Sequence, residues 1–159
     1  MKPVEAAPEL EEFLRRPENR AFLEFYEYWR RKAAGKVLPS RADLDPLEIP
    51  QLLPDTFLVD VVPGQPRRFR FRLVGTRIAE LEGEMTNKFL DEFIPDSAGT
   101  ALARHYEEAA EGRIAARRET LRWHVRERQH VHYDVLLLPL SRDGTTIDML
   151  FGYCVYYVK

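Results

Sequence analysis

The clearest hydrophobic pattern in the chain lies between Asn19 and Gly35, where apolar side chains recur at helical spacing. These positions are Phe22, Phe25, Tyr26, Trp29 and Ala33. Because charged residues occupy many of the other positions, the pattern predicts an amphipathic helix with Asn19 as its N-cap and Gly35 as its C-cap. A shorter helical segment is expected before it, between Pro8 and Pro17. The aromatic stripe of the longer helix needs a cover, which either the chain's own sheet or a partner must supply.

Prolines at positions 39, 46, 50 and 54 exclude a long helix from the stretch that follows. The segment from Leu38 to Pro54 is therefore predicted to be a connector of short turns. Asp45, which precedes Pro46, would cap one of these turns.

Alternation of apolar and polar residues comes next, and it predicts a β-hairpin. The two strands run over Thr56–Val62 and Arg68–Val74, and the turn between them is Pro63-Gly64-Gln65-Pro66. On the second strand, Phe69, Phe71 and Leu73 would share one face, and Arg68, Arg70 and Arg72 the other. We expect the apolar face to form part of the core.

The alternation stops after Gly75, where short helical pieces are expected, followed by a helix over about Asp96–Gly112. Three further strands are predicted at Ile114–Val125, His130–Leu140 and Thr146–Val158. The last of these is apolar on both faces, which is typical of a strand in the middle of a covered sheet. The sequence therefore predicts an α+β fold with a five-stranded antiparallel sheet.

Two stretches carry a family resemblance. The run Phe71-Arg72-Leu73-Val74-Gly75-Thr76 leads from the hairpin towards Ile78, and the connector opens with Leu38-Pro39-Ser40-Arg41. With this order of elements the chain resembles the PAS family, and more narrowly a group of small stand-alone bacterial PAS-like proteins. The resemblance implies an N-terminal helical extension at 1–37 and a PAS-like domain at 38–159. It also implies the strand order 2-1-5-4-3 across the sheet.

What a PAS-like domain does is left open by the resemblance, because some members bind haem, flavin or small metabolites and others only mediate protein contacts. We expect a core between the sheet and the crossover helices, and its residues are the candidate ligand-binding set. They are Phe71, Leu73, Tyr106, Trp123 and Tyr133. The candidate homodimer interface is on the N-terminal helix, at Phe22, Tyr26 and Trp29.

Candidate cofactor ligands are few. His105 lies on the inner stripe of the long helix, where haem-binding PAS domains place an iron ligand, but the bulky neighbours favour a packed or hydrogen-bonded core histidine. His124, His130 and His132 could share a metal, yet spacing fixes no acidic or cysteine ligand beside them. The reactive cysteine of light-sensing flavin domains is missing after the hairpin, since the one cysteine, Cys154, is on the last strand. We predict no haem, flavin or metal.

Composition narrows the function classes further. With 45% hydrophobic and 31% charged residues, the chain has the make-up of an ordinary globular protein. Its net charge of -2 gives no general attraction to nucleic acid or to an anionic membrane. An acidic N-terminus and the lack of a long apolar run predict a cytoplasmic protein. No catalytic motif is found, so an enzyme is not expected.

The leading interpretation is a stand-alone regulatory module that forms a homodimer, docks on a signalling protein and has a small ligand as a candidate occupant of its core. The alternative is a small-molecule or haem sensor whose ligand state is itself the signal.

Overall fold

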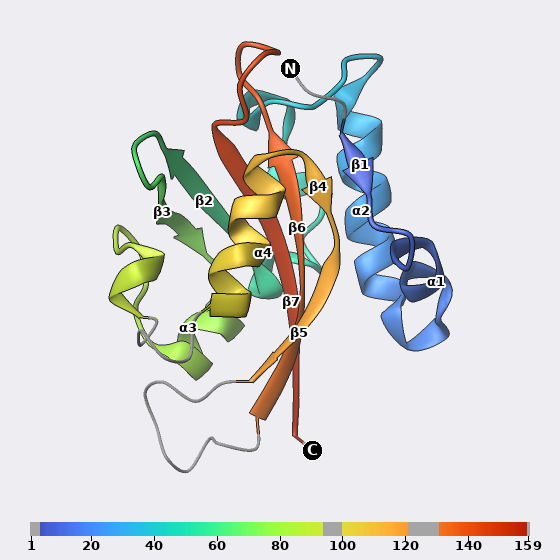
Figure 1. Cartoon of the computed structure of the whole chain (residues 1–159). Coiled ribbons are helices and arrows are strands. Elements are labelled where there is room, and N and C mark those ends of the chain that lie inside the picture. Colours follow the sequence, from blue (N-terminus) through green and yellow to red (C-terminus); the bar gives the residue numbers. More distant parts are fainter. Residues whose placement is uncertain (1–3, 94–99, 121–130, 159) are drawn as a thin grey trace.

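The computed structural model describes residues 4–93, 100–120 and 131–158. Its centre is a five-stranded antiparallel sheet with the strand order β3-β2-β7-β6-β5 (Figure 1). The strands are β2 (Thr56–Val62), β3 (Arg68–Val74), β5 (Ala116–Thr120), β6 (Val131–Leu140) and β7 (Met149–Val158). Counted along the chain, this is the predicted order 2-1-5-4-3, with the last strand in the middle. The α+β fold class is confirmed.

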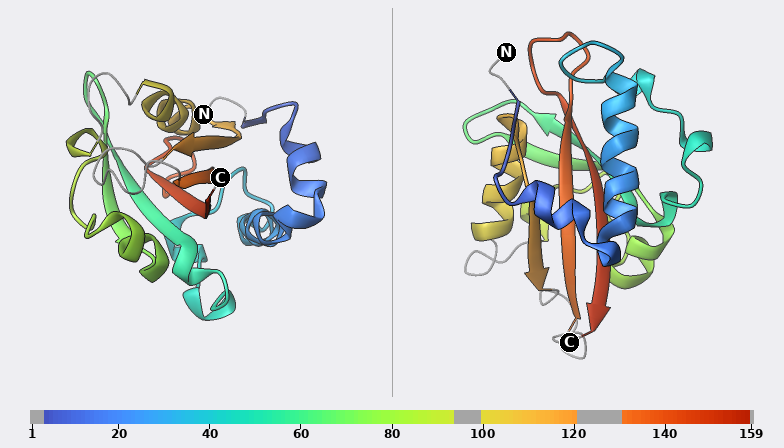
Figure 2. Two further views of the ribbon diagram at one scale, coloured as in Figure 1. Left: turned by 90° about the horizontal axis from the view of Figure 1, so that it is seen from below. Right: turned by 90° about the vertical axis from the view of Figure 1, so that its right-hand side faces the viewer.

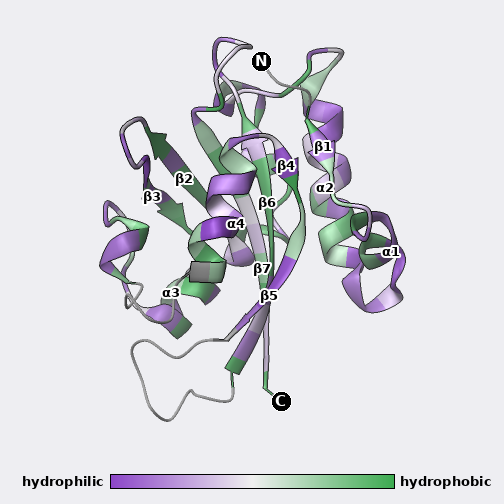
Figure 3. Ribbon diagram, in the orientation of Figure 1, coloured by the Kyte–Doolittle hydropathy of each residue, from purple (hydrophilic) through white to green (hydrophobic). Residues whose placement is uncertain are grey.

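Helices cover both faces of this sheet. On one face lie α1 (Leu10–Arg15) and α2 (Arg20–Ala33), and on the other lie α3 (Thr76–Glu82) and α4 (Thr100–Ala110), as Figure 2 shows. Figure 3 shows hydrophilic and hydrophobic residues mixed along α2 and α4, as expected for helices that have one side on a sheet. We call the face under α3 and α4 the inner face and the face under α2 the outer face.

Short elements complete the chain. The proline-rich connector forms three 3₁₀ turns, η2 (Arg41–Asp43), η3 (Pro46–Glu48) and η4 (Leu53–Asp55), which confirms the predicted series of turns. Two further 3₁₀ turns among the described residues are η1 (Pro17–Asn19) and η5 (Leu90–Glu92). The carboxylate of Asp45 accepts a hydrogen bond of 3.0 Å from the backbone N–H of Leu47 and so caps η3. Near the N-terminus, β1 (Glu5–Ala6) pairs in parallel with β4 (Arg113–Ile114).

The aromatic side chains of α2 pack on the outer face of the central strands. The ring of Phe25 stacks on Phe151 with 4.2 Å between centroids, and Phe22 meets Tyr153 edge-on at 5.3 Å. The indole N–H of Trp29 donates a hydrogen bond of 2.9 Å to the carbonyl of Pro139. The chain's own sheet therefore supplies the cover that this aromatic stripe needs.

Asn19 is the N-cap residue of α2, as predicted, although its side chain makes no capping hydrogen bond, and the C-cap is Ala34, one residue before the predicted Gly35. Its amide instead donates to the carbonyl of Phe13, at 2.9 Å, and so ties α1 to α2.

The hairpin contains a β-bulge that the alternation pattern does not reveal. Phe71 lies opposite Val59, whereas Leu73 lies opposite the preceding residue of β2, Leu58, so Arg72 is an extra residue in β3. The bulge reverses the side on which the following residues point. Leu73 is therefore 44% exposed, and the prediction that it lies in the core is wrong.

The arginines of β3 are held by acids. Arg70 and Arg72 both contact the carboxylate of Asp60, at 3.1 and 2.9 Å, and Arg68 contacts Asp91 at 2.8 Å. Each of the three arginines on this edge strand therefore has an acidic partner within the chain.

The predicted strand Ile114–Val125 is interrupted. Ala115 separates β4 from β5, and β5 is described only as far as Thr120. Trp123, His124 and His130 lie outside the described residues. In the part of the chain that is described, no helix is long and apolar enough to span a membrane.

Candidate functional site

A small cavity lies in the core between the inner face of the sheet, α3, η5 and α4. Its volume is about 30 Å³, which is room for about one water molecule and far below the roughly 300–1,000 Å³ of typical ligand pockets. Side chains therefore fill most of the core. The described lining consists of Phe57, Phe71, Val74, Ile78, Glu82, Met85, Leu90, Phe93, Leu102, Tyr106, Tyr133, Val135, Cys154 and Tyr156.

Three of the five candidate residues predicted from the sequence lie at this cavity. Phe71, Tyr106 and Tyr133 line the cavity together, as expected of core residues. Leu73 does not line it, because the bulge turns this side chain away and places Val74 at the wall instead. Trp123, the fifth candidate, lies outside the described residues.

Glu82, the last residue of α3, is the polar group that the sequence analysis missed. One carboxylate oxygen, Oε2, accepts a hydrogen bond from the hydroxyl of Tyr156 on β7. The other, Oε1, is buried and has no hydrogen-bond partner in the described part of the chain. Burial raises the pKa of this carboxyl to about 7. A signal was available: Glu82 is four residues after the apolar Ile78, which places both on the same side of a helix.

Four neutral polar groups share the cavity with Glu82. Tyr106 comes from α4, Tyr133 from β6, and Cys154 and Tyr156 from β7. The Cys154 thiol donates to the Tyr156 hydroxyl at 3.9 Å, which continues the hydrogen-bond chain from Glu82. Burial raises the pKa of all four groups well above its ordinary value, so they stay protonated near neutral pH. Among the described lining residues, Glu82 alone changes charge in that range.

His105 is not part of the cavity wall. It is 2% exposed, and its Nε2 lies 2.9 Å from the carbonyl oxygen of Ala115. Because a carbonyl only accepts, Nε2 carries the proton and Nδ1 is the unprotonated nitrogen. That nitrogen is buried without a partner in the described chain, and burial lowers the histidine pKa to about 4. The prediction of a packed, hydrogen-bonded core histidine is confirmed.

The predicted histidine trio is only partly described. The ring of His132 stacks on Tyr157 at 5.7 Å, while the other two histidines lie outside the described residues. Within residues 4–93, 100–120 and 131–158, no group of three acidic, histidine or cysteine side chains could hold a metal ion.

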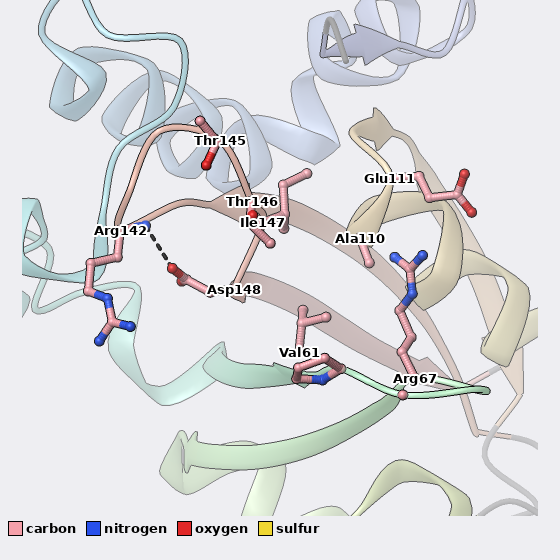
Figure 4. Close-up of a pocket in the computed structure, with 11 residues that line it drawn as sticks. Val61, Arg67, Ala110, Glu111, Arg142, Thr145, Thr146, Ile147 and Asp148 are labelled. Atoms are coloured by element: carbon pink, nitrogen blue, oxygen red, sulfur yellow. Dashed lines mark hydrogen bonds between the residues drawn. The ribbon is translucent and has the colours of Figure 1, made fainter. Parts of the chain in front are cut away.

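A larger depression of about 690 Å³ is open to solvent near the turns that follow β2 and β6 (Figure 4). Arg67 and Arg142 lie on opposite sides of it in Figure 4, and Glu111 and Asp148 balance their charge. The carboxylate of Asp148 accepts from the backbone N–H of Arg142, at 2.7 Å. No buried polar atom of the described lining lacks a partner, so this surface is less specialised than the core cavity.

The third surface of interest is the predicted dimer interface on α2. Phe22 and Trp29 are 1% and 6% exposed, because the chain's own sheet covers them. Tyr26 is partly exposed. The homodimer therefore stays a prediction, and only Tyr26 of the three residues could contact a second copy without rearrangement of α2.

Comparison with known proteins agrees with the fold. A family model described as PAS domain matches residues 18–155, from η1 through most of β7. A search of the curated proteins gave no significant match. The matched segment includes α2, and the predicted domain boundary at 37/38 stays a prediction. With the sheet order and the matched length in agreement, this chain belongs to the PAS domain family and is, in general terms, a sensory or regulatory module.

Proposed function

We propose that the protein is a sensory module that holds a small ligand in its core cavity and passes the state of that cavity to protein contacts on its outer face. One observation carries the proposal. The Oε1 atom of Glu82 is buried without a hydrogen-bond partner in the described chain, in a core that is otherwise apolar or neutral. Buried polar atoms are nearly always satisfied, so this oxygen calls for a ligand or a water molecule as its partner.

Strand β7 connects the cavity to the outer face. Cys154 and Tyr156 line the cavity, while Phe151 and Tyr153 on the same strand contact the aromatic side chains of α2. A ligand that moves Tyr156 would therefore act on the strand that supports α2. Packed interfaces switch between discrete arrangements rather than deforming smoothly, so a small movement of β7 would change how α2 packs.

The protein contact that such a change in α2 would alter is a homodimer or a contact with a signalling protein. Tyr26 on α2 is partly exposed and offers aromatic area for such a contact. Phe22 and Trp29 would support this surface from below. The haem form of the sensor hypothesis is not favoured, because Nε2 of His105 is engaged by Ala115 and His105 is absent from the described cavity wall.

Native mass spectrometry of freshly purified protein tests the ligand. We expect a non-covalent adduct on the wild type that is lost in Val135→Leu, which adds one methylene group to the cavity wall. Val59→Leu is the matched control, since Val59 is buried on β2 outside the described lining. An adduct of equal abundance in all three proteins, or no adduct on the wild type, would contradict a core ligand.

The same spectra test the protein contact. We expect a dimer that becomes a monomer in Tyr26→Asp, whereas the control Glu24→Gln on the same helix stays dimeric. A wild-type protein that is monomeric with and without ligand would contradict the homodimer.

A further inference from the structure

The wall of the core cavity combines aromatic rings with a single acid. The rings belong to Phe57, Phe71, Phe93, Tyr106, Tyr133 and Tyr156. The acid is Glu82, and no lysine, arginine or histidine is found among the described lining residues. An ionised carboxylate in such surroundings is costly unless a positive charge or hydrogen-bond donors compensate it. The described chain supplies one donor, the Tyr156 hydroxyl.

Aromatic rings attract cations through the negative charge on their faces, and the attraction is stronger where water is excluded. They also pack well against carbon atoms. An organic ammonium group matches both properties, since it has a diffuse positive charge and an apolar surface.

Resting on the ligand-binding role proposed above, we infer that the cavity selects a compact alkylammonium ion, with its charge beside Glu82 and its carbon atoms against the aromatic rings. Because a volume of about 30 Å³ is room for about one water molecule, the ligand is restricted to one or two heavy atoms unless a tyrosine ring moves. A metal ion is a poorer match, because metals of the Mg²⁺ or Ca²⁺ type take several oxygen ligands and the described wall has one carboxylate.

This ligand class has a defined pH dependence. The titratable groups of the described chain that face Glu82 are Tyr106 on α4, Tyr133 on β6, and Cys154 and Tyr156 on β7. Their raised pKa values keep them neutral, whereas the pKa of Glu82 is about 7. Because protonation of Glu82 removes the charge that holds the cation, affinity should fall as the pH drops below 7, by up to about tenfold per pH unit.

Two probes of nearly equal size and shape test the charge selectivity on the full chain. They are methylammonium chloride and its uncharged analogue methanol, titrated by NMR at pH 8 and pH 5.5. We expect methylammonium to bind at least tenfold more tightly than the alcohol at pH 8, and this preference to shrink at least tenfold at pH 5.5.

The variant Glu82→Gln should abolish the preference for the cation and leave the affinity for the alcohol unchanged. Glu80→Gln, an exposed glutamate of the same helix, should keep the preference. Circular dichroism of each variant establishes that it is folded.

Equal binding of the two probes, or a preference that persists in Glu82→Gln, would overturn the inference while leaving a core ligand intact. Failure of both probes to bind would also overturn it. The proposed function is then judged separately by the adduct on the wild-type protein, which depends on neither probe.

Discussion

Burial moves the pKa values of two side chains in opposite directions. The carboxyl of Glu82 has its pKa raised to about 7, and the imidazole of His105 has its pKa lowered to about 4. In both cases burial is the largest cause, because a low-dielectric surrounding disfavours the charged form. The free energies that the two groups add to folding therefore change with pH in opposite senses, and between about pH 4.5 and 6.5 they oppose each other.

Glu82→Gln should remove a loss of stability that the wild type shows as the pH rises from 4.5 to 7. In the folded protein Glu82 keeps its proton up to about pH 7, while in the unfolded chain it loses it near the model value of 4.5. The stabilisation is therefore complete below pH 4.5 and is lost as the pH rises to 7, on the order of 3 kcal/mol. Urea unfolding at a series of pH values measures it. An identical pH dependence in the wild type and the variant would show that Glu82 titrates normally.

His105→Gln should have the reverse effect. The folded-state pKa is below the model value of 6.5, so the stabilisation is present above pH 6.5 and is lost as the pH falls to about 4. Proton uptake at the buried Nδ1 would be the cause. We expect the wild type to lose on the order of 3 kcal/mol more than the variant between pH 7 and pH 4 in the same urea experiments. Parallel curves would contradict this assignment.

Phe71→Ala and Leu73→Ala form a matched pair on either side of the bulge. Phe71 is 3% exposed, so its truncation should lower the free energy of unfolding by about 3–5 kcal/mol. Leu73 is 44% exposed, so its truncation should lower it by less than about 0.5 kcal/mol. Chemical unfolding of both variants measures the difference. Similar losses would show that β3 continues without a bulge in solution.

These residues also show what the sequence could reveal. Phe71, Tyr106 and Tyr133 are found by periodicity because they lie in regular stretches of strand and helix. Leu73 is misplaced because a bulge changes the period without a mark in the local sequence. Glu82 was overlooked because a glutamate at a helix end is ordinarily solvated, and only the tertiary fold places Tyr156 above it.

At the scale of secondary-structure elements, a close contact between Gly152 and Phe57 joins the paired strands β2 and β7. Gly152 lies opposite Phe57, and a Cβ atom at this position would be 2.1 Å from the ring of Phe57. The glycine thus leaves room for an aromatic side chain that also lines the core cavity.

Gly152→Ala should destabilise the protein by about 1–3 kcal/mol through overpacking. In a background with Phe57→Leu, the added methyl group should cost less, because the smaller side chain gives way. A double-mutant cycle with thermal unfolding measures the coupling between the two positions. Strict additivity would contradict the contact.

The sequence predicts which helices and strands form better than it predicts the residues at which they begin and end. The hairpin strands agree with the structure, because both are bounded by strong turn signals. The helix predicted at 96–112 ends at Ala110, while its predicted start lies outside the described residues, and the third predicted strand is broken at Ala115. The break coincides with the carbonyl that binds His105, a contact between α4 and the sheet that local pattern does not contain.

At the scale of the whole molecule, α1 and α2 act as the cover of the outer face. Deleting residues 1–35 would remove that cover from Phe151 and Tyr153, whose rings lie against α2. We expect lower solubility and a lower unfolding temperature for the shortened chain, because burying one large aromatic side chain contributes about 1.5–3 kcal/mol. Static light scattering and calorimetry provide the measurement. A shortened protein as soluble and stable as the full chain would show that α2 is an independent appendage.

The position of β7 also governs when the fold can assemble. This strand is the last of the sheet along the chain, yet it pairs with β2 on one side and β6 on the other. Contacts between such distant residues slow folding, because a long loop must close before they form. During synthesis, the β2–β3 hairpin leaves the ribosome well before its central neighbour and keeps one strand edge unpaired. Assembly of the sheet is therefore a late event in synthesis. Until β7 is available, the unpaired edge of β2 is the place where a chaperone would bind or an incorrect strand would pair.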